Sequence, residues 1–261
     1  DSFFDGGKFT NEKNILLHAE KMIAEGADII DIGACSTRPN AKEVSEDEEL
    51  KRLIPAIKLV RKKFPDAIIS ADTFRSKVAE EAVNAGADMI NDISGGGFAE
   101  AVTLSAVEGS FSMFATIAKL NVPYVLMHIQ GTPQTMQKNP IKKKVIKKVY
   151  YYFAEQMAAA KSKGVKQIIL DPGFGFGKSL ESNYELLANL SLFTKMNRPM
   201  LIGVSRKSMI NKALGSTPET ALNGTTAANT IALMNGANIL RVHDVKEAKE
   251  AVKIFNCMNK C

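Results

Sequence analysis

The chain has 261 residues, 45% of them hydrophobic, which is enough to bury a full core as one large α/β domain or two small ones. Its 34 basic and 28 acidic residues give a formal charge of +6, which favours anionic ligands. No apolar run approaches the roughly 20 residues that span a bilayer, and the N-terminus shows neither a basic start nor an apolar signal core. We therefore expect a cytoplasmic protein without a membrane segment.

The first predicted element is a helix from about Asn11 to Glu25, which follows the loop-like start DSFFDGG. After it, short β-branched runs alternate with amphipathic helical patterns, which indicates parallel strands covered on both faces. The runs are residues 27–33, 67–73, 88–94, 124–130, 167–173, 200–206 and 238–244. The similar phrases AEGADIID, NAGADMIND and MNGANILRV each contain a glycine that ends a helix before a strand, as in a repeated βα unit.

These strands and helices, without a linker between them, predict a single domain over residues 1–261 with an α/β fold, the (β/α)₈ TIM barrel. Seven strands are visible, and an open barrel would leave two unpaired edges. We therefore expect the first strand to precede Asp1. The alternative fold is a doubly wound open sheet, which the absence of a glycine fingerprint after the first visible strand disfavours.

The basic segment KNPIKKKVIKKVYYYF predicts a solvated helix, with Ile141, Val145, Ile146 and Val149 on its apolar face. No aromatic stacking set or binding motif accompanies the lysines, so we expect no nucleic-acid partner. The cysteines, which are Cys35, Cys257 and Cys261, have neither a disulfide framework nor a metal-ligand spacing. We expect them to be free thiols.

Polar residues follow the predicted strands, at the end of a barrel where catalytic loops converge. One group offers acceptors and an amide suited to the N–H edges of a polar heterocycle, and a second group offers donors for an anion. The first group is Asp72, Asn91 and Asp171, and the second is Arg38, Lys207, Arg241 and His243. A single strand-end Asp is more often a cap or turn residue, but the repeated pattern predicts an active site. His18 and His128 are expected to be structural.

Other chemistries lack their motifs. The chain has no His-x-x-x-His, cysteine pair or dense carboxylate cluster, so we expect no metal site built from its own side chains. The acidic stretch SEDEEL, residues 45–50, predicts a helix start capped by Ser45. The stretch GVSRKS does not match the nucleophile elbow Gly-x-Ser-x-Gly.

The stretch LDPGFGFGKS, residues 170–179, resembles a phosphate loop but fails its test. Pro172 holds the place of the first glycine of G-x-x-x-x-G-K-S, and the spacing also fails G-x-G-x-x-G. We expect instead a loop whose glycines let a flat ring approach the backbone beside Phe176. A plain turn into a helix near Leu180 is the alternative. Lys178 is expected to face away as a helix-start charge.

Seven ordered blocks resemble the signature of the dihydropteroate synthase family, from Asp1 to about Phe255. The blocks are DSFFDGG, DIGACSTRPNA, ISADTFRSKVAEEAVNAGADMINDISGG, LMHIQGTPQTM, ILDPGFGFGKS, LIGVSRKSMI and ILRVHDV. The resemblance implies a (β/α)₈ barrel that joins p-aminobenzoate to 6-hydroxymethyl-7,8-dihydropterin diphosphate and releases diphosphate. It also implies Mg²⁺, inhibition by sulfonamides as arylamine mimics, and a homodimer.

The resemblance assigns residues to each substrate. The pterin would be held by Asp72, Asn91, Asp171 and Lys207, in a slot lined by Met127, Phe176 and Gly203. The diphosphate would be bound by Arg241 and His243. The p-aminobenzoate site would be shaped by Phe3, Thr37, Arg38, Pro39, Lys207 and Ser208. The expected catalytic groups are Asp72, Asp171, Lys207, Arg241 and His243.

The chain departs from the family pattern in three places. The metal-contacting asparagine of the family lies before Asp1, Cys35 stands where many members have glutamate, and residues 95–120 are longer than expected. The middle of that segment, about residues 99–111, is compatible with an extended helix or a surface excursion. The alternative functions are a pterin-dependent methyltransferase and an inactive pterin-binding scaffold.

Overall fold

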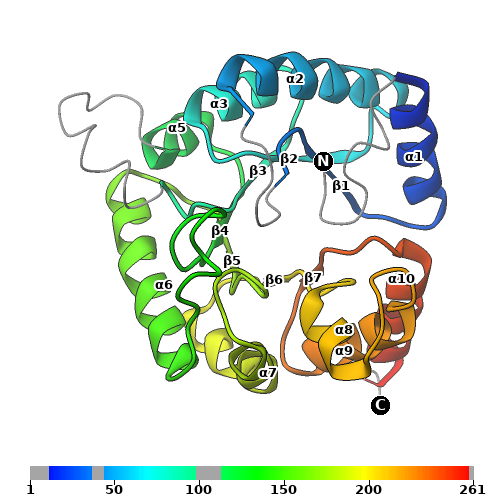
Figure 1. The fold of residues 1–261 in the computed structure, drawn as a ribbon. Helices are drawn as coiled ribbons and strands as arrows, with labels where there is room; N and C mark the ends of the chain where they lie inside the picture. Colours follow the sequence, from blue (N-terminus) through cyan, green and yellow to red (C-terminus); the bar gives the residue numbers. More distant parts are fainter. Residues whose placement is uncertain (1–11, 37–43, 98–112, 259–261) are drawn as a thin grey trace.

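The structure, a computed structural model, describes residues 12–36, 44–97 and 113–258, and Figure 1 shows their helices arranged around a central group of strands. The strands are β1 (Ile29–Gly33), β2 (Ile68–Asp72), β3 (Met89–Asp92), β4 (Tyr124–Met127), β5 (Ile168–Asp171), β6 (Leu201–Ile202) and β7 (Ile239–Leu240). The helices are α1 (Glu12–Ala24), α2 (Glu46–Lys63), α3 (Ser76–Asn84), α5 (Met113–Leu120), α6 (Val145–Ser162), α7 (Leu180–Ala188), the 3₁₀ helix η1 (Leu190–Met196), α8 (Ser208–Leu214), α9 (Leu222–Met234) and α10 (Val245–Met258).

The strands are parallel and stand side by side in chain order. Pairing runs from β1 through β5 and again between β6 and β7, while an isolated bridge between Leu170 and Met200 joins the two sets. The described strands therefore show no reversal of order, and a doubly wound sheet requires one. The strand expected before Asp1 lies outside this sequence and stays a prediction.

One apolar cluster shows that the strands curve into a barrel. It contains the buried Met89, Val125 and Leu201 together with the partly buried Ile29, Ile169 and Ile239. These side chains come from β1, β3, β4, β5, β6 and β7, so the first and last described strands meet in the same interior layer. Layers of this kind fill the inside of a (β/α) barrel. The larger core lies between the strands and the helices, where Ile57, Ile69 and Leu126 are buried.

The helix boundaries follow the capping signals in the sequence. The Ser45 hydroxyl accepts a hydrogen bond from the Glu48 amide at 3.3 Å, which confirms the capped start of α2. Three glycines of the repeated phrase have positive φ and follow α1, α3 and α9, which confirms them as helix ends. They are Gly26, Gly86 and Gly236, with φ values of 94°, 114° and 95°.

The basic segment departs from its prediction at one position. α6 begins at Val145, and Ile141 lies before it, where its amide donates to the Gly177 carbonyl at 2.9 Å. Val145 and Val149 are buried on the helix as expected. No helix among the described residues is both long and apolar enough to cross a membrane.

Candidate active site

Four polar side chains meet where β1, β2, β3 and β7 end, and we call them the arginine cluster: Asp31, Asp72, Asn91 and Arg241. The Arg241 guanidinium donates from Nε to Asp31 Oδ2 at 2.6 Å and from Nη2 to Asp72 Oδ2 at 2.8 Å. The Asn91 amide donates to Asp31 Oδ2 at 3.2 Å. The cluster thus joins the last described strand to the first three.

The cluster places opposed charges in a partly buried environment, in which the side chains of Asp31 and Asp72 are 18% and 15% exposed and that of Arg241 is 40% exposed. Burial raises the pKa of Asp72 to about 7 although Arg241 opposes this shift, and Asp31 and Glu49 add to it. For Arg241, burial lowers the pKa, but the carboxylates of Asp31 and Asp72 outweigh that effect and hold it above its ordinary value. Arg241 therefore stays charged, and burial shifts the pKa of Asp72 from its ordinary acidic value towards neutral pH.

The second part of the site is the glycine loop, residues 171–178, which follows β5. The Asp171 carboxylate accepts a hydrogen bond from the Gly173 amide at 2.8 Å, and only 7% of Asp171 is exposed. Burial raises its pKa, while the positive charge of Lys207 is the strongest opposing influence. A buried carboxylate with one oxygen engaged by the backbone keeps its other acceptor positions for a ligand.

Lys207, which precedes α8, reaches across to the glycine loop. Its ammonium donates to the Phe174 carbonyl at 2.6 Å and lies 4.8 Å from the centre of the Phe176 ring. Burial lowers the pKa of Lys207 to about 8, although Asp171 favours the charged form. A side chain added at Gly203 would lie 3.7 Å from the Lys207 ammonium, so Gly203 borders the same space.

Packing within the protein accounts for two glycines of this loop, and the expected approach of a flat ring to the backbone stays a prediction. A Cβ atom on Gly173 would lie 2.0 Å from the His128 carbonyl oxygen, and one on Gly177 would lie 2.5 Å from Gln130 Cβ. Both residues also have positive φ. They are glycine because the loop packs against the segment after β4, whereas Gly175 lies near Lys207.

Lys178 corrects a prediction. It was expected to face away from the protein, but it is only 5% exposed and its ammonium is surrounded by backbone carbonyls. The helix start expected near Leu180 is confirmed, with Ser179 as the N-cap of α7. A lysine at a helix start is usually exposed, and the sequence did not show that backbone carbonyls from two loops surround this one.

His243 lies beyond Arg241 and is oriented by Ser205. The Ser205 hydroxyl lies 2.9 Å from His243 Nδ1 and also accepts from the His243 amide at 3.2 Å. His128 is buried instead, in an edge contact with the Tyr152 ring, and burial holds its pKa well below the ordinary value. This placement agrees with a structural His128.

The structure brings together most of the predicted site residues that it describes. Met127 and Phe176 are buried in one cluster with Ile93 and Met136 near the strand ends. Ser208 is exposed at the first residue of α8. The remaining predictions, which are Phe3, Thr37, Arg38 and Pro39, lie outside the described residues, as do the loop positions 99–111.

Sequence reasoning missed the role of Asp31. It lies on β1 and was visible as a polar residue near a strand end, but its partner Arg241 stands far along the chain and only the fold brings them together. Ser205 was visible in the same way, in the segment SRKS. Both residues could have been identified by their position at a strand end, if every polar residue at such a position had been treated as a candidate.

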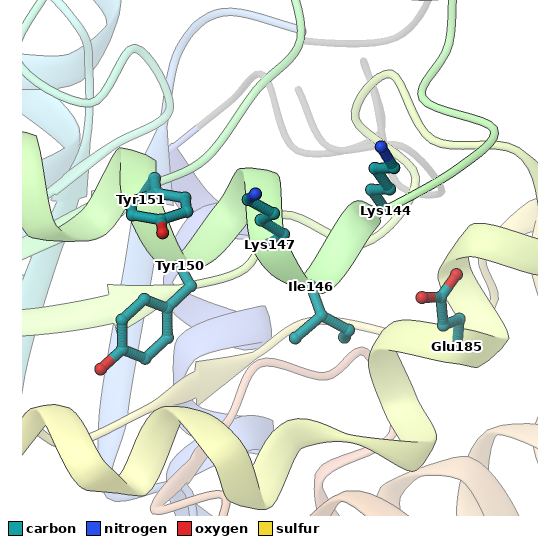
Figure 2. Close-up of a pocket in the computed structure, with 6 residues that line it drawn as sticks. All are labelled: Lys144, Ile146, Lys147, Tyr150, Tyr151 and Glu185. Carbon is teal, nitrogen blue, oxygen red and sulfur yellow. The ribbon is translucent and has the colours of Figure 1, made fainter.

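A hollow of about 450 Å³ lies between α6 and α7, and Figure 2 shows the side chains that line it. Its lining comes from α6 and its start, together with one residue of α7. The lining residues are Lys144, Ile146, Lys147, Tyr150, Tyr151 and Glu185. None of them is a predicted site residue, so the chemistry belongs to the strand ends.

A barrel with buried carboxylates, an amide and fixed cations at its strand ends is the architecture of a pterin-binding protein. The family model described as pterin binding enzyme matches residues 1–243, and the chain belongs to this family. Within it, the chain is 44% identical to the dihydropteroate synthase of Escherichia coli K12, covering 97% of this chain and 86% of the relative. The Haemophilus influenzae dihydropteroate synthase is 43% identical, with 98% and 89% covered.

The solved structures agree. The Yersinia pestis dihydropteroate synthase in complex with a sulfonamide drug matches with a TM-score of 0.90 at 40% identity, covering 100% of this chain and 91% of that one. The Xanthomonas albilineans dihydropteroate synthase with 4-aminobenzoic acid matches with a TM-score of 0.85 at 35% identity, covering 99% and 89%. The expected TIM-barrel fold is thus confirmed, and the function is that of a dihydropteroate synthase, a transferase of folate biosynthesis.

Proposed function

We propose that the chain condenses 6-hydroxymethyl-7,8-dihydropterin diphosphate with p-aminobenzoate, with the pterin against the glycine loop and the diphosphate at Arg241 and His243. The observation that carries this assignment is the meeting, at one end of one barrel, of a buried carboxylate with a free acceptor side and a guanidinium held between two carboxylates. The first suits the N–H edge of a heterocycle, and the guanidinium suits an anion that replaces its carboxylate partners.

The pterin would donate hydrogen bonds to Asp171 and Asp72 and meet the amide of Asn91. Lys207 would contribute a donor from the opposite side of the same space, and the apolar faces of Met127 and Phe176 would pack on the ring. Gly203 leaves room there because a side chain at this position would approach the Lys207 ammonium. Burial of these groups strengthens each polar contact with the substrate.

The reaction is leaving-group chemistry. The bond between the pterin methylene carbon and the diphosphate oxygen breaks, and its electron pair leaves with the diphosphate. The arylamine nitrogen of p-aminobenzoate then bonds to the methylene carbon and releases a proton. Arg241 and His243 stabilise the negative charge that grows on the diphosphate. The carboxylate of Asp171 favours the positive charge on the pterin, and Asp72 adds to this effect in its ionised form.

The p-aminobenzoate site is proposed on the family resemblance. Lys207 and the exposed Ser208 border the described part of it, and Phe3, Thr37, Arg38 and Pro39 complete it from outside the described residues. Relatives solved with 4-aminobenzoic acid and with a sulfonamide drug support an arylamine site and its inhibition by sulfonamides.

Magnesium is a further proposal from the resemblance. Among residues 12–36, 44–97 and 113–258, no three His, Cys, Asp or Glu side chains form a metal-ligand group, and Asp31 and Asp72 are engaged by Arg241. These residues do not fit a metal site of their own. Magnesium in enzymes that act on phosphates is held largely by substrate oxygens and water, which is the form of binding we propose.

A homodimer and a cytoplasmic location complete the proposal. Large apolar side chains are exposed on two helices late in the chain that pack together, α9 and α10. They are Ile231, Met234, Ile254 and Met258, which are 44%, 62%, 65% and 55% exposed. Such a surface supports an interface between subunits. The Cys35 thiol, which lies 3.7 Å from the Arg75 guanidinium and forms no disulfide, supports a reducing compartment. Sedimentation at several protein concentrations tests the dimer.

The enzymatic proposal is tested by diphosphate release. The protein is mixed with the pterin diphosphate, p-aminobenzoate and Mg²⁺, and diphosphate and dihydropteroate are measured together. We expect stoichiometric formation of both, dependent on the arylamine and blocked by a sulfonamide. Pterin binding without turnover would favour the scaffold, and transfer of a methyl group from a methylated folate would favour the methyltransferase.

A further inference from the structure

Lys178 is a buried lysine to which the proposed chemistry gives no role. It stands directly before Ser179, the N-cap of α7, and is 5% exposed. Both features disfavour a cation, because a helix N-terminus carries partial positive charge and burial penalises a charged amine. Burial accordingly lowers the pKa of Lys178 to about 7, although Asp171 favours the charged form. A lysine in such a place needs compensating contacts.

The compensation comes from the backbone. The Lys178 ammonium donates to the carbonyl oxygens of Gly173 at 2.7 Å, Phe176 at 3.1 Å and His128 at 3.3 Å. An ammonium has three N–H donors, so the acceptors match the donors in number. A methionine fills similar space but has no donor, and a guanidinium is a planar fork that does not converge on three carbonyls.

The three carbonyls belong to two different loops. Gly173 and Phe176 lie in the glycine loop, and His128 follows β4. These loops also approach closely elsewhere, since the His128 amide donates to the Asp171 carbonyl at 2.9 Å and Gly173 packs on the His128 carbonyl. Lys178 therefore fastens the segment that follows Met127 to the loop that carries Asp171 and Phe176.

Two bonds of Lys178, to Gly173 and Phe176, lead to residues expected to contact the pterin, and the third is made to His128, the chain neighbour of Met127. Gly173 makes two contacts through its backbone. Its carbonyl accepts from the Lys178 ammonium, and its amide donates to the Asp171 carboxylate at 2.8 Å. The Phe176 carbonyl accepts from the same ammonium, while the Phe176 ring faces Lys207. Asn183 of α7 adds support, since its side chain accepts from the Gly175 amide at 2.8 Å.

We propose that Lys178 is a positioning residue for pterin recognition: by holding the carbonyls of Gly173, Phe176 and His128, it fixes the Asp171 carboxylate and the Phe176 ring relative to Met127. The inference deepens the proposed function and rests on it, since it concerns the same pterin slot. Lys178 itself contacts no substrate in this scheme, and it acts through the backbone that it binds.

The test compares Lys178→Met with Lys166→Met in the full chain. Lys166 is an exposed lysine just before β5, at the opposite end of that strand, and serves as the matched control. Binding of 6-hydroxymethylpterin is measured by calorimetry, and the KM for p-aminobenzoate is measured at saturating pterin diphosphate. We expect Lys178→Met to weaken pterin binding by about 10-fold to 100-fold, because one well-placed hydrogen bond to a charged acceptor contributes about this much. The KM for p-aminobenzoate and the Lys166 variant should stay near wild type.

A rescue experiment separates positioning from plain stability. In Lys178→Ala the lost atoms correspond to n-propylammonium, which is added to the protein alongside n-propanol as the uncharged match. We expect the ammonium, and not the alcohol, to restore pterin affinity. If Lys178→Met does not fold, Lys178→Arg keeps the charge but not the convergent donors, and we expect it to fold with the same loss of pterin affinity.

The outcomes are distinct. Wild-type protein that binds no pterin overturns the proposed function and this inference with it. If the wild-type protein binds pterin and the Lys178 variants bind it equally well but melt at a lower temperature, the inference alone is overturned. Equal rescue by the ammonium and the alcohol also overturns it, because the effect would then be one of filling space.

Discussion

The arginine cluster and the glycine loop lie at the same end of the barrel but hold their charges in different ways. In the arginine cluster, Arg241 contacts the side chains of Asp31 and Asp72. In the glycine loop, Asp171 accepts from a backbone amide, and Lys178 and Lys207 donate to backbone carbonyls. One region thus pairs charges with charges, and the other pairs charges with the main chain.

Because of this difference, we expect the two regions to respond differently when ligands bind. A diphosphate competes directly with Asp31 and Asp72 for the donors of Arg241, so binding there exchanges one set of charge contacts for another. The backbone contacts of the glycine loop need not break when a pterin arrives, because the acceptors used by the ligand are separate. The arginine cluster is therefore expected to rearrange, and the glycine loop to be preformed.

The largest expected effect is that of Arg241→Ala. It removes two charge-assisted donors from the diphosphate, and we expect it to weaken binding of the pterin diphosphate by about 3 kcal/mol. Binding of a bare pterin should change by much less. Calorimetry with both ligands measures the difference, and Arg241→Lys keeps the charge without the fork as a control. Equal losses for the two ligands would show that the two regions act as one.

Asp171→Asn tests the other side of the comparison. We expect it to weaken binding of a bare pterin by about 2 kcal/mol, because a charged acceptor is lost. The melting temperature should change little, since the asparagine oxygen still accepts from the Gly173 amide. Asp28→Asn, at a carboxylate that pairs with Lys249 on the surface, is the matched control. Unchanged pterin affinity would make Asp171 a turn residue only.

Rearrangement at the arginine cluster predicts a proton exchange. Burial already raises the pKa of Asp72 to about 7 while Arg241 opposes the shift. When diphosphate takes over Arg241 and brings negative charge, the pKa of Asp72 should rise further, so binding takes up protons near neutral pH. Affinity for the pterin diphosphate should therefore fall by about 1 kcal/mol as pH rises through this range.

The proton uptake is measured by calorimetry in buffers of different ionisation enthalpy. Asp72→Asn should abolish it, and a bare pterin should produce much less of it than the diphosphate. Proton release on diphosphate binding would have the wrong sign for this account.

The smallest expected effect is that of Ser205→Ala. Ser205 contacts both Nδ1 and the amide of His243, so its loss removes contacts that orient the imidazole. We expect the pterin diphosphate to bind about 1 kcal/mol more weakly, the value of one ordinary hydrogen bond, without an effect on bare pterin. If both ligands respond alike, Ser205 supports the fold around β6 rather than the diphosphate.

Much of this architecture was predictable because it depends on residues that are close together in the sequence. The β-branched runs gave all seven described strands, and helix ends at Gly26, Gly86 and Gly236 need only a few adjacent residues. The strand-end rule likewise located Asp72 and Asp171. These features depend on short stretches whose physical preferences do not require knowledge of the rest of the chain.

What could not be predicted depends on contacts between distant segments. Asp31 and Arg241 meet only because the barrel brings its last described strand near its first. Lys178 looks like a solvated charge until three carbonyls from two loops surround it. Ile141 has the spacing of a helix face but pairs with the glycine loop instead. In each case the partner is set by the fold rather than by sequence neighbours.

The interior layer of Met89, Val125 and Leu201 also restricts the routes by which ligands reach the site. It fills the interior beneath the polar strand ends, so ligands reach those ends from the side of the loops that follow the strands. Pterin, arylamine, diphosphate and product must therefore all enter and leave on that side of the barrel.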